Sequence, residues 1–284
     1  MLKKIFFAAA LLLASELIAK PVVIASIAPV EYLAKAVGGD KIEVQSLAKG
    51  DVHSYEPKPN DMKAVAKARI FIAAGLEFEE AWIPRFKASA KNLVVVKSDA
   101  KIAKLKEERG EQAEHDEKHE AHADPHVWLN PMLAITMARN ISDALIAMDK
   151  ANKDFYLENF QKLMNDLLAF DESAKESLAG LKNRKFVVYH PAWGYFAAHY
   201  DLEQISIERS GKEPKIDEMA STLKMIKDEN IKVIFADPNR SQKSAQILAS
   251  QAGAKVELLD PLGYNLLENL KIAVGAIKDA NSPK

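Results

Sequence analysis

The chain has 284 residues, of which 48% are hydrophobic and 28% charged, and its formal net charge is −1. This length is sufficient for two domains, each with its own core, and the near-neutral charge argues against a nucleic-acid partner, which requires a concentrated basic surface. The sequence contains no cysteine, which excludes disulfides, thiolate metal sites, a cysteine nucleophile and a lipid-modified cysteine.

The first 20 residues, MLKKIFFAAALLLASELIAK, have the parts of a secretory signal peptide. Lys3 and Lys4 form a basic n-region, residues 5–13 form an apolar run too short to span a bilayer, and Ala19 is a small residue suited to cleavage. We therefore predict a signal peptide over residues 1–19 and export to the periplasm without a membrane anchor. A short buried helix is the alternative interpretation.

Residues 20–151 alternate short β-rich segments with helical segments, and we predict an N-terminal α/β lobe. Helices are predicted over residues 28–40, closed by a glycine pair, and 62–68, capped by Asn60 or Asp61. This alternation favours right-handed crossovers and a parallel sheet. The predicted strands cover residues 21–27, 41–48, 69–75 and 93–99.

Residues 104–124 interrupt the alternation because they contain almost no apolar side chains. A segment that cannot bury a face is expected to be a mobile, solvated loop. Its histidines, His115, His119 and His122, predict at most a weak, auxiliary second metal site. A merely solvated charged loop is the alternative interpretation.

Ordered structure is predicted to resume with a helix capped by Asn130 and started by Pro131. Residues 152–181 then carry apolar side chains at helical spacing, with no proline and no glycine before Gly180. We predict one long linking helix there, roughly double the usual 11–12 residues. Alternation resumes over residues 182–284, which predicts a C-terminal α/β lobe. Its strands are predicted at residues 185–190, 202–207, 232–237 and 255–260.

Four metal-type side chains fall where ligands bind in open α/β sheets, at the carboxyl ends of strands or beside a helix start. His53 follows the strand at 41–48, His190 and Asp260 end later strands, and His126 precedes the helix that starts at Pro131. All four can point into one cleft between the halves. Three imidazoles and one carboxylate suit Zn²⁺, held tetrahedrally at about 2.0–2.2 Å.

Each of these positions also has a simpler interpretation. A lone histidine at a strand end is more often a hydrogen-bonded core or surface residue, and Asp260 before Pro261 could merely begin a turn. Asp237 also ends a strand and is the main rival to Asp260 as a ligand. His199 follows His190 at the far end of the next helix and is expected to point away from the cleft as a surface residue.

The sequence gives little support for a catalytic function. The segment HDEKH does not match HExxH, and neither a GxSxG elbow nor a P-loop occurs. A catalytic zinc would need an open coordination position and a nearby base, for which Glu56 is the candidate. We therefore predict a metal-binding protein that is not an enzyme, with an exported zinc hydrolase as the alternative from another class.

Four segments resemble the signatures of the metal-specific solute-binding proteins of ABC transporters, known as cluster A-I, in order along the mature chain: DVHSYEPKPNDM, DPHVWLNP, VVYHPAWGYFAAHYDL and LLDPLG. The resemblance, which is to the zinc-specific periplasmic members, implies two (β/α)4-like lobes with parallel sheets joined by a single long helix. It also implies a metal in the cleft between the lobes and its delivery to an inner-membrane ABC permease. We further expect a monomer.

The resemblance assigns the ligand roles to His53, His126, His190 and Asp260. The third position resembles a glutamate in manganese-type members, and imidazole suits zinc whereas carboxylate oxygens suit manganese. Some zinc-type members have a glutamate where Val52 stands here, so Asp260 or a water is expected to complete the site. The same fold serving manganese or iron(II), or a surface adhesin, are the alternatives within the family. Because protons compete with zinc for imidazole, we expect zinc affinity to weaken between roughly pH 7 and 5. With three histidines, the dependence should be steeper than one proton per metal.

Overall fold

The computed structural model describes residues 20–106, 123–208 and 216–281, so the predicted signal peptide and His115, His119 and His122 lie outside it. Across these residues, eight strands form two parallel four-stranded sheets, ordered β2-β1-β3-β4 and β6-β5-β7-β8. The predicted α/β class with two parallel sheets is confirmed. The strands are β1 (Val22–Ala25), β2 (Glu43–Ser46), β3 (Ile70–Ala73), β4 (Val94–Lys97), β5 (Lys185–Val188), β6 (Glu203–Ser206), β7 (Val233–Ala236) and β8 (Lys255–Leu258).

The helices around the first sheet are α1 (Ala28–Gly38), α2 (Pro59–Val65), α3 (Glu77–Ser89) and α4 (Pro131–Met148). The predicted cap of α4 is confirmed, since the Asn130 side chain accepts hydrogen bonds from the backbone N–H groups of Met132 and Leu133. The predicted start of α2 is wrong. The helix begins at Pro59, because the fixed φ of proline suits the first turn and the Asp61 carboxylate accepts the Lys58 N–H.

Helix α3 has no counterpart among the sequence predictions. Its weak apolar periodicity and the internal Pro84 conceal it. Its start is fixed by the buried carboxylate of Glu79, which accepts the backbone N–H groups of Ala74, Gly75 and Leu76. A buried glutamate as an anchor for three backbone donors is a tertiary feature that periodicity does not indicate.

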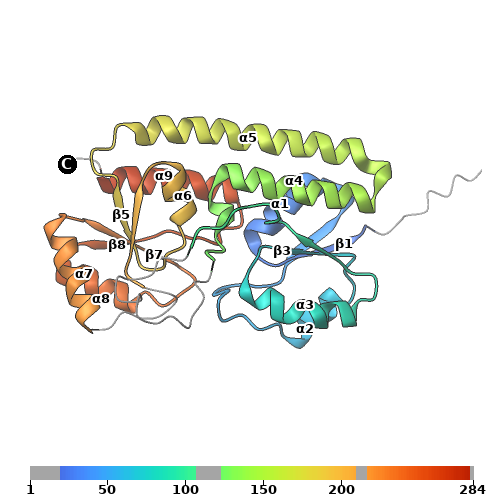
Figure 1. The fold of residues 1–284 in the computed structure, drawn as a ribbon, viewed down its shortest axis with the longest axis horizontal. Helices are drawn as coiled ribbons and strands as arrows, with labels where there is room; N and C mark the ends of the chain where they lie inside the picture. Colours follow the sequence, from blue (N-terminus) through green and yellow to red (C-terminus); the bar gives the residue numbers. More distant parts are fainter. Residues whose placement is uncertain (1–19, 107–122, 209–215, 282–284) are drawn as a thin grey trace, which may run out of the picture.

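The long helix α5 (Lys153–Ala179) has 27 residues and packs on α1 and α4 in one lobe and on α9 in the other. Figure 1 shows it running along both lobes, as predicted. The second sheet is accompanied by α6 (Gly194–His199), α7 (Ile216–Asp228), α8 (Lys243–Ala252) and α9 (Leu266–Asn281). Of the helices in the described ranges, none combines the length and hydropathy needed to cross a membrane.

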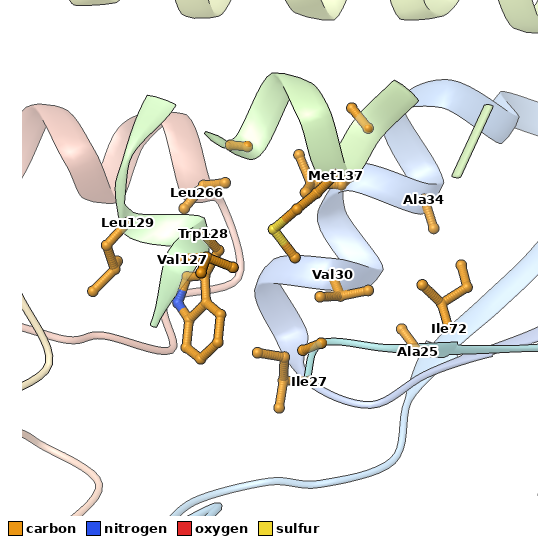
Figure 2. Close-up of a cluster of buried hydrophobic side chains, with 14 of the residues drawn as sticks. Ala25, Ile27, Val30, Ala34, Ile72, Val127, Trp128, Leu129, Met137 and Leu266 are labelled. Carbon is orange, nitrogen blue, oxygen red and sulfur yellow. The ribbon is translucent and has the colours of Figure 1, made fainter. Parts of the chain in front are cut away.

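One apolar core continues from the first lobe into the second. The short 3-10 helix η3 (Val127–Leu129) lies in this core, and Figure 2 shows the Trp128 and Leu266 side chains in one cluster with Ile27 and Val30. The Trp128 indole N–H also donates to the Pro261 carbonyl at 2.7 Å. The lobes are therefore joined by a packed, hydrogen-bonded contact in addition to α5, and the residues flanking η3 are held between them.

Candidate metal centre

Three histidines from both lobes converge at one point. His53 lies in the loop after β2, His126 directly precedes η3, and His190 follows β5. Their ligand atoms lie within 4.8 Å of one another, and the Nε2 atoms of His53 and His190 are 3.2 Å apart. Among the described residues, this is the one group of three or more histidine, aspartate or glutamate side chains placed closely enough to hold a metal.

His126 is oriented by the carboxylate two residues before it. Asp124 Oδ1 accepts from the His126 backbone N–H at 2.9 Å and lies 2.8 Å from its Nδ1, and both residues are buried. Because a carboxylate accepts hydrogen bonds, Nδ1 carries the ring proton and Nε2 keeps its lone pair for a metal. Asp124 was not among the predicted site residues, although the motif DPH contains it.

Tyr195 of α6 connects this carboxylate to the second lobe. Its hydroxyl donates to the Asp124 backbone carbonyl at 2.8 Å and accepts the backbone N–H of Leu105 at 2.8 Å. The backbone on both sides of the segment 107–122 is thus tied to one side chain of the other lobe. These two hydrogen bonds position the backbone that leads to His126, and no apolar pattern in the sequence indicates them.

His190 has two partners at its Nδ1 atom. Glu208 Oε2 lies 2.8 Å away and Arg240 Nη1 lies 2.6 Å away. Arg240 also donates to both Glu208 oxygens, at 3.1 and 3.0 Å. Glu208 is 4% exposed, and this burial raises its pKa while the adjacent Arg240 lowers it. Neither residue was predicted, because they follow β6 and β7 and meet His190 only through the sheet order.

Two of the three imidazoles, those of His53 and His190, have lowered pKa values. Desolvation, followed by the nearby rings of His126 and His190, lowers the pKa of His53 to about 4. Burial, with His126 and Arg240, holds the pKa of His190 well below its ordinary value. Zn²⁺ binds neutral imidazole, so near neutral pH these two side chains need not lose a proton before they bind the ion.

The predicted fourth ligand, Asp260, stands outside this group of three. Among the described residues, its carboxylate accepts from the Asn239 side-chain amide and the Leu262 backbone N–H, both at 2.8 Å and both through Oδ1. Asn239 also donates to Asp237, the alternative candidate for the fourth ligand. A cavity of about 10 Å³ beside the histidines is lined by Asp237, together with Asp51, Val52, Pro261 and Leu262. Such a volume is about that of one water.

The sequence analysis also made predictions for His199 and Glu56, and both residues lie away from the metal centre. His199 does not join the site, as expected, but it is not a surface residue. Its Nε2 lies 2.6 Å from the buried Asp171 carboxylate of α5, so it holds α6 against the long helix. Glu56, the candidate base of the hydrolase alternative, is exposed and is not part of the histidine group.

Comparison with known proteins places these features in a family context. Residues 23–280 match the family described as zinc-uptake complex component A, periplasmic (ZnuA). The chain is 30% identical over 279 residues to the high-affinity zinc uptake system protein ZnuA of Bacillus subtilis strain 168, covering 91% of this chain and 86% of that protein.

Two solved structures are similar over nearly the whole chain. A crystal structure of ZnuA aligns with a TM-score of 0.85 and 35% identity, covering 93% of this chain and 100% of that one. A ZnuA deletion mutant with zinc bound aligns with a TM-score of 0.86 and 34% identity, covering 93% and 99%.

Proposed function

This chain belongs to the ZnuA family of periplasmic zinc-uptake components, and we propose on that basis that it captures Zn²⁺ between its lobes for import by an ABC transporter. The observation that carries the proposal is the convergence of three imidazoles from both lobes within 4.8 Å. We assign His53, His126 and His190 as the ligands. Each reaches the site from a different segment, so a bound ion would join the two lobes.

The chemistry of these donors supports zinc over manganese or iron(II). Zinc is bound by neutral imidazole nitrogens at about 2.0–2.1 Å, whereas manganese prefers carboxylate and water oxygens. Lowered pKa values at His53 and His190 keep these rings neutral. The buried carboxylates nearby, Asp124 and Glu208, contact the far nitrogens of the rings and so act on ligand orientation.

Asp260 is proposed as the fourth ligand, with a water as the alternative occupant of that position. Its Oδ2 is free of the two hydrogen bonds that hold Oδ1, so it could turn toward a cation without releasing Asn239 or Leu262. The carboxylate would have to approach the histidines, and the small cavity beside Asp237 supplies room for a water until it does.

Transport, rather than catalysis, accounts best for the whole site. The permease of an ABC importer is the proposed partner, and the periplasm, reached by means of the signal peptide at residues 1–19, is the proposed location. Turnover of an ester or peptide would require a base beside the metal. The carboxylates that contact the rings, Asp124 and Glu208, are each engaged at a ring nitrogen that faces away from the proposed ion.

Isothermal titration with zinc tests the assignment. Alanine variants of His53, His126 and His190 are each expected to lose the tight site, because a two-imidazole site must be completed by water. His199→Gln is the matched control, since it removes a histidine that lies in the same lobe as His190 but outside the metal centre. Wild-type affinity in any of the three alanine variants would remove that residue from the site.

A further inference from the structure

The Tyr195 hydroxyl is inserted between two paired backbone segments. Lys106 and Ala123 form an antiparallel bridge, and in the neighbouring pair the Asp124 N–H donates to the Leu105 carbonyl at 2.9 Å. In a regular antiparallel ladder this pair would exchange a second bond, from the Leu105 N–H to the Asp124 carbonyl. Here both of these groups bond to the Tyr195 hydroxyl instead, each at 2.8 Å. A side chain of α6 therefore completes the pair.

A phenolic hydroxyl is suited to this bridging position because it donates one hydrogen bond and accepts others. Tyr195 is buried, and this burial raises its pKa to about 12. The hydroxyl therefore keeps its proton, which it donates to the Asp124 carbonyl. Phenylalanine at this position would leave that carbonyl, in a buried residue, without its donor. A buried group that loses its partner is costly, so the backbone at Asp124 is expected to shift.

Gly194, the residue before Tyr195, makes a second close approach to Asp124. A β-carbon at Gly194 would lie only 3.1 Å from Asp124 Oδ2, so the glycine leaves room for this carboxylate beside the first turn of α6. The other oxygen, Oδ1, lies 2.9 Å from the His126 backbone nitrogen and 2.8 Å from His126 Nδ1. Two adjacent residues of α6 thus contact the residue that orients His126, one at its carbonyl and one at its carboxylate.

Helix α6 belongs to the lobe that carries His190, and it follows His190 closely in the chain. We propose that Gly194 and Tyr195 are positioning residues of the zinc site. They hold Asp124, and through it His126, in place relative to His190, whose ring centroid lies 5.3 Å from that of His126. This inference rests on the proposed zinc site and assigns to it two residues that contact no metal.

Zinc titration tests the proposal. Tyr195→Phe should weaken zinc binding roughly tenfold, the lower end of the ~10–100-fold losses caused by removing groups behind a metal ligand. Gly194→Ala keeps the hydroxyl but crowds the same carboxylate, and it should weaken binding as well. Wild-type zinc affinity in Tyr195→Phe would overturn the role of Tyr195, and wild-type affinity in Gly194→Ala would overturn that of Gly194.

Each variant has a matched control in the same protein. Tyr156→Phe removes a hydroxyl from another buried tyrosine, which donates to Asp149 at 3.0 Å in the N-terminal lobe. Gly275→Ala adds a methyl group to a helical glycine of α9 that has no atom within 4 Å of the new carbon. Both controls should keep the zinc affinity of the wild type.

Double-mutant cycles test the route through Asp124. The losses in Tyr195→Phe and Asp124→Asn should be less than additive, because both act on His126. The losses in Tyr195→Phe and Glu208→Gln should be additive, since Glu208 contacts the ring of His190 instead. Full additivity of Tyr195→Phe with Asp124→Asn would show that Tyr195 does not act through Asp124.

The visible absorption of the Co²⁺-loaded protein reports ligand geometry, which a purely structural role would leave unchanged. Tyr195→Phe should change the position and intensity of the Co²⁺ bands, whereas Tyr156→Phe should only lower the urea midpoint. A lowered midpoint in Tyr195→Phe with an unchanged Co²⁺ spectrum and zinc affinity would reduce Tyr195 to a structural residue. That outcome defeats the inference alone, whereas a wild-type protein that binds no zinc defeats the proposed function and the inference with it.

Discussion

The Nε2 atoms of His53 and His190 lie 3.2 Å apart, although one residue belongs to the loop after β2 and the other to the end of β5 in the opposite lobe. Two imidazole nitrogens at this distance share one proton or one cation. On the proposed function, one zinc ion would be bound by both nitrogens and so join the two lobes.

The pH dependence of zinc binding should be shallow near neutrality. The pKa of His53 is lowered to about 4 and that of His190 lies well below its usual value, so neither ring competes with zinc for protons until the medium is acidic. Between pH 7 and 5 we expect no more than one proton per zinc, and a steeper loss as the pH falls toward 4. This replaces the steeper dependence expected from three ordinary histidines.

The folding stability of the protein without zinc should fall with pH in the same direction as the zinc affinity. Below about pH 6.5 the unfolded chain binds protons at these histidines that the native state refuses, so the metal-free protein loses stability as the pH falls toward 4. Zinc titrations and urea denaturation at several pH values measure both effects. Release of two or more protons per bound zinc between pH 7 and 5 would contradict the lowered pKa values.

Metal choice should depend on the third imidazole. His190→Glu replaces a borderline nitrogen ligand with a hard carboxylate and should shift the zinc-to-manganese affinity ratio toward manganese. The shift is limited by Glu208, whose carboxylate would then stand beside another carboxylate. His190→Gln is the control for loss of the ring without added charge. An unchanged ratio in His190→Glu would show that this ligand does not set selectivity.

The contribution of Asp260 can be separated from that of Asp237 by amide substitutions. Asp260→Asn keeps an acceptor for Asn239 and Leu262 but removes the charge offered to zinc, and we expect weaker zinc binding, with a smaller loss than in any histidine variant. Asp237→Asn is the matched comparison. Competition with a chelator measures the zinc affinity of both variants. A larger loss of affinity in Asp237→Asn would assign the role of fourth ligand to Asp237 and not to Asp260.

Trp128 should contribute to stability through its contact across the lobes. Trp128→Phe removes the indole N–H that donates to the Pro261 carbonyl and leaves that acceptor unsatisfied, at a cost of about 1–3 kcal/mol. Urea denaturation of the metal-free protein measures the change. Trp82→Phe, at a half-buried position on α3, is the control and should cost less. Equal stability of Trp128→Phe and the wild type would show that this contact is energetically neutral.

The histidines between Lys106 and Ala123 should be dispensable for the tight site. Lys106 and Ala123 form an antiparallel bridge, and the Asp124 N–H donates to the Leu105 carbonyl, so a two-residue Asn-Gly turn can replace residues 107–122. We expect one tight zinc per chain with nearly unchanged affinity and loss of any weaker binding. If the deletion abolishes the tight site, the predicted separation of His126 from His115, His119 and His122 is wrong.

Much of the fold could be predicted because alternation of strands and helices is a local signal. The Asn130-Pro131 start of α4 and the apolar spacing of α5 are local too. The convergence of three histidines was predictable for a similar reason, since ligands in parallel sheets gather at the carboxyl ends of strands. The residues that contact the His190 ring from behind could not be predicted. Glu208 and Arg240 become neighbours of His190 only when the order β6-β5-β7 is known.

The most direct test of the zinc site is a crystal structure of protein purified without added metal, with diffraction data collected on both sides of the zinc absorption edge. We predict one strong anomalous peak that appears only above the edge, about 2.0–2.1 Å from the Nε2 atoms of His53, His126 and His190. A peak bound by carboxylates elsewhere, or one at the three histidines that belongs to another metal, would contradict zinc capture at this centre.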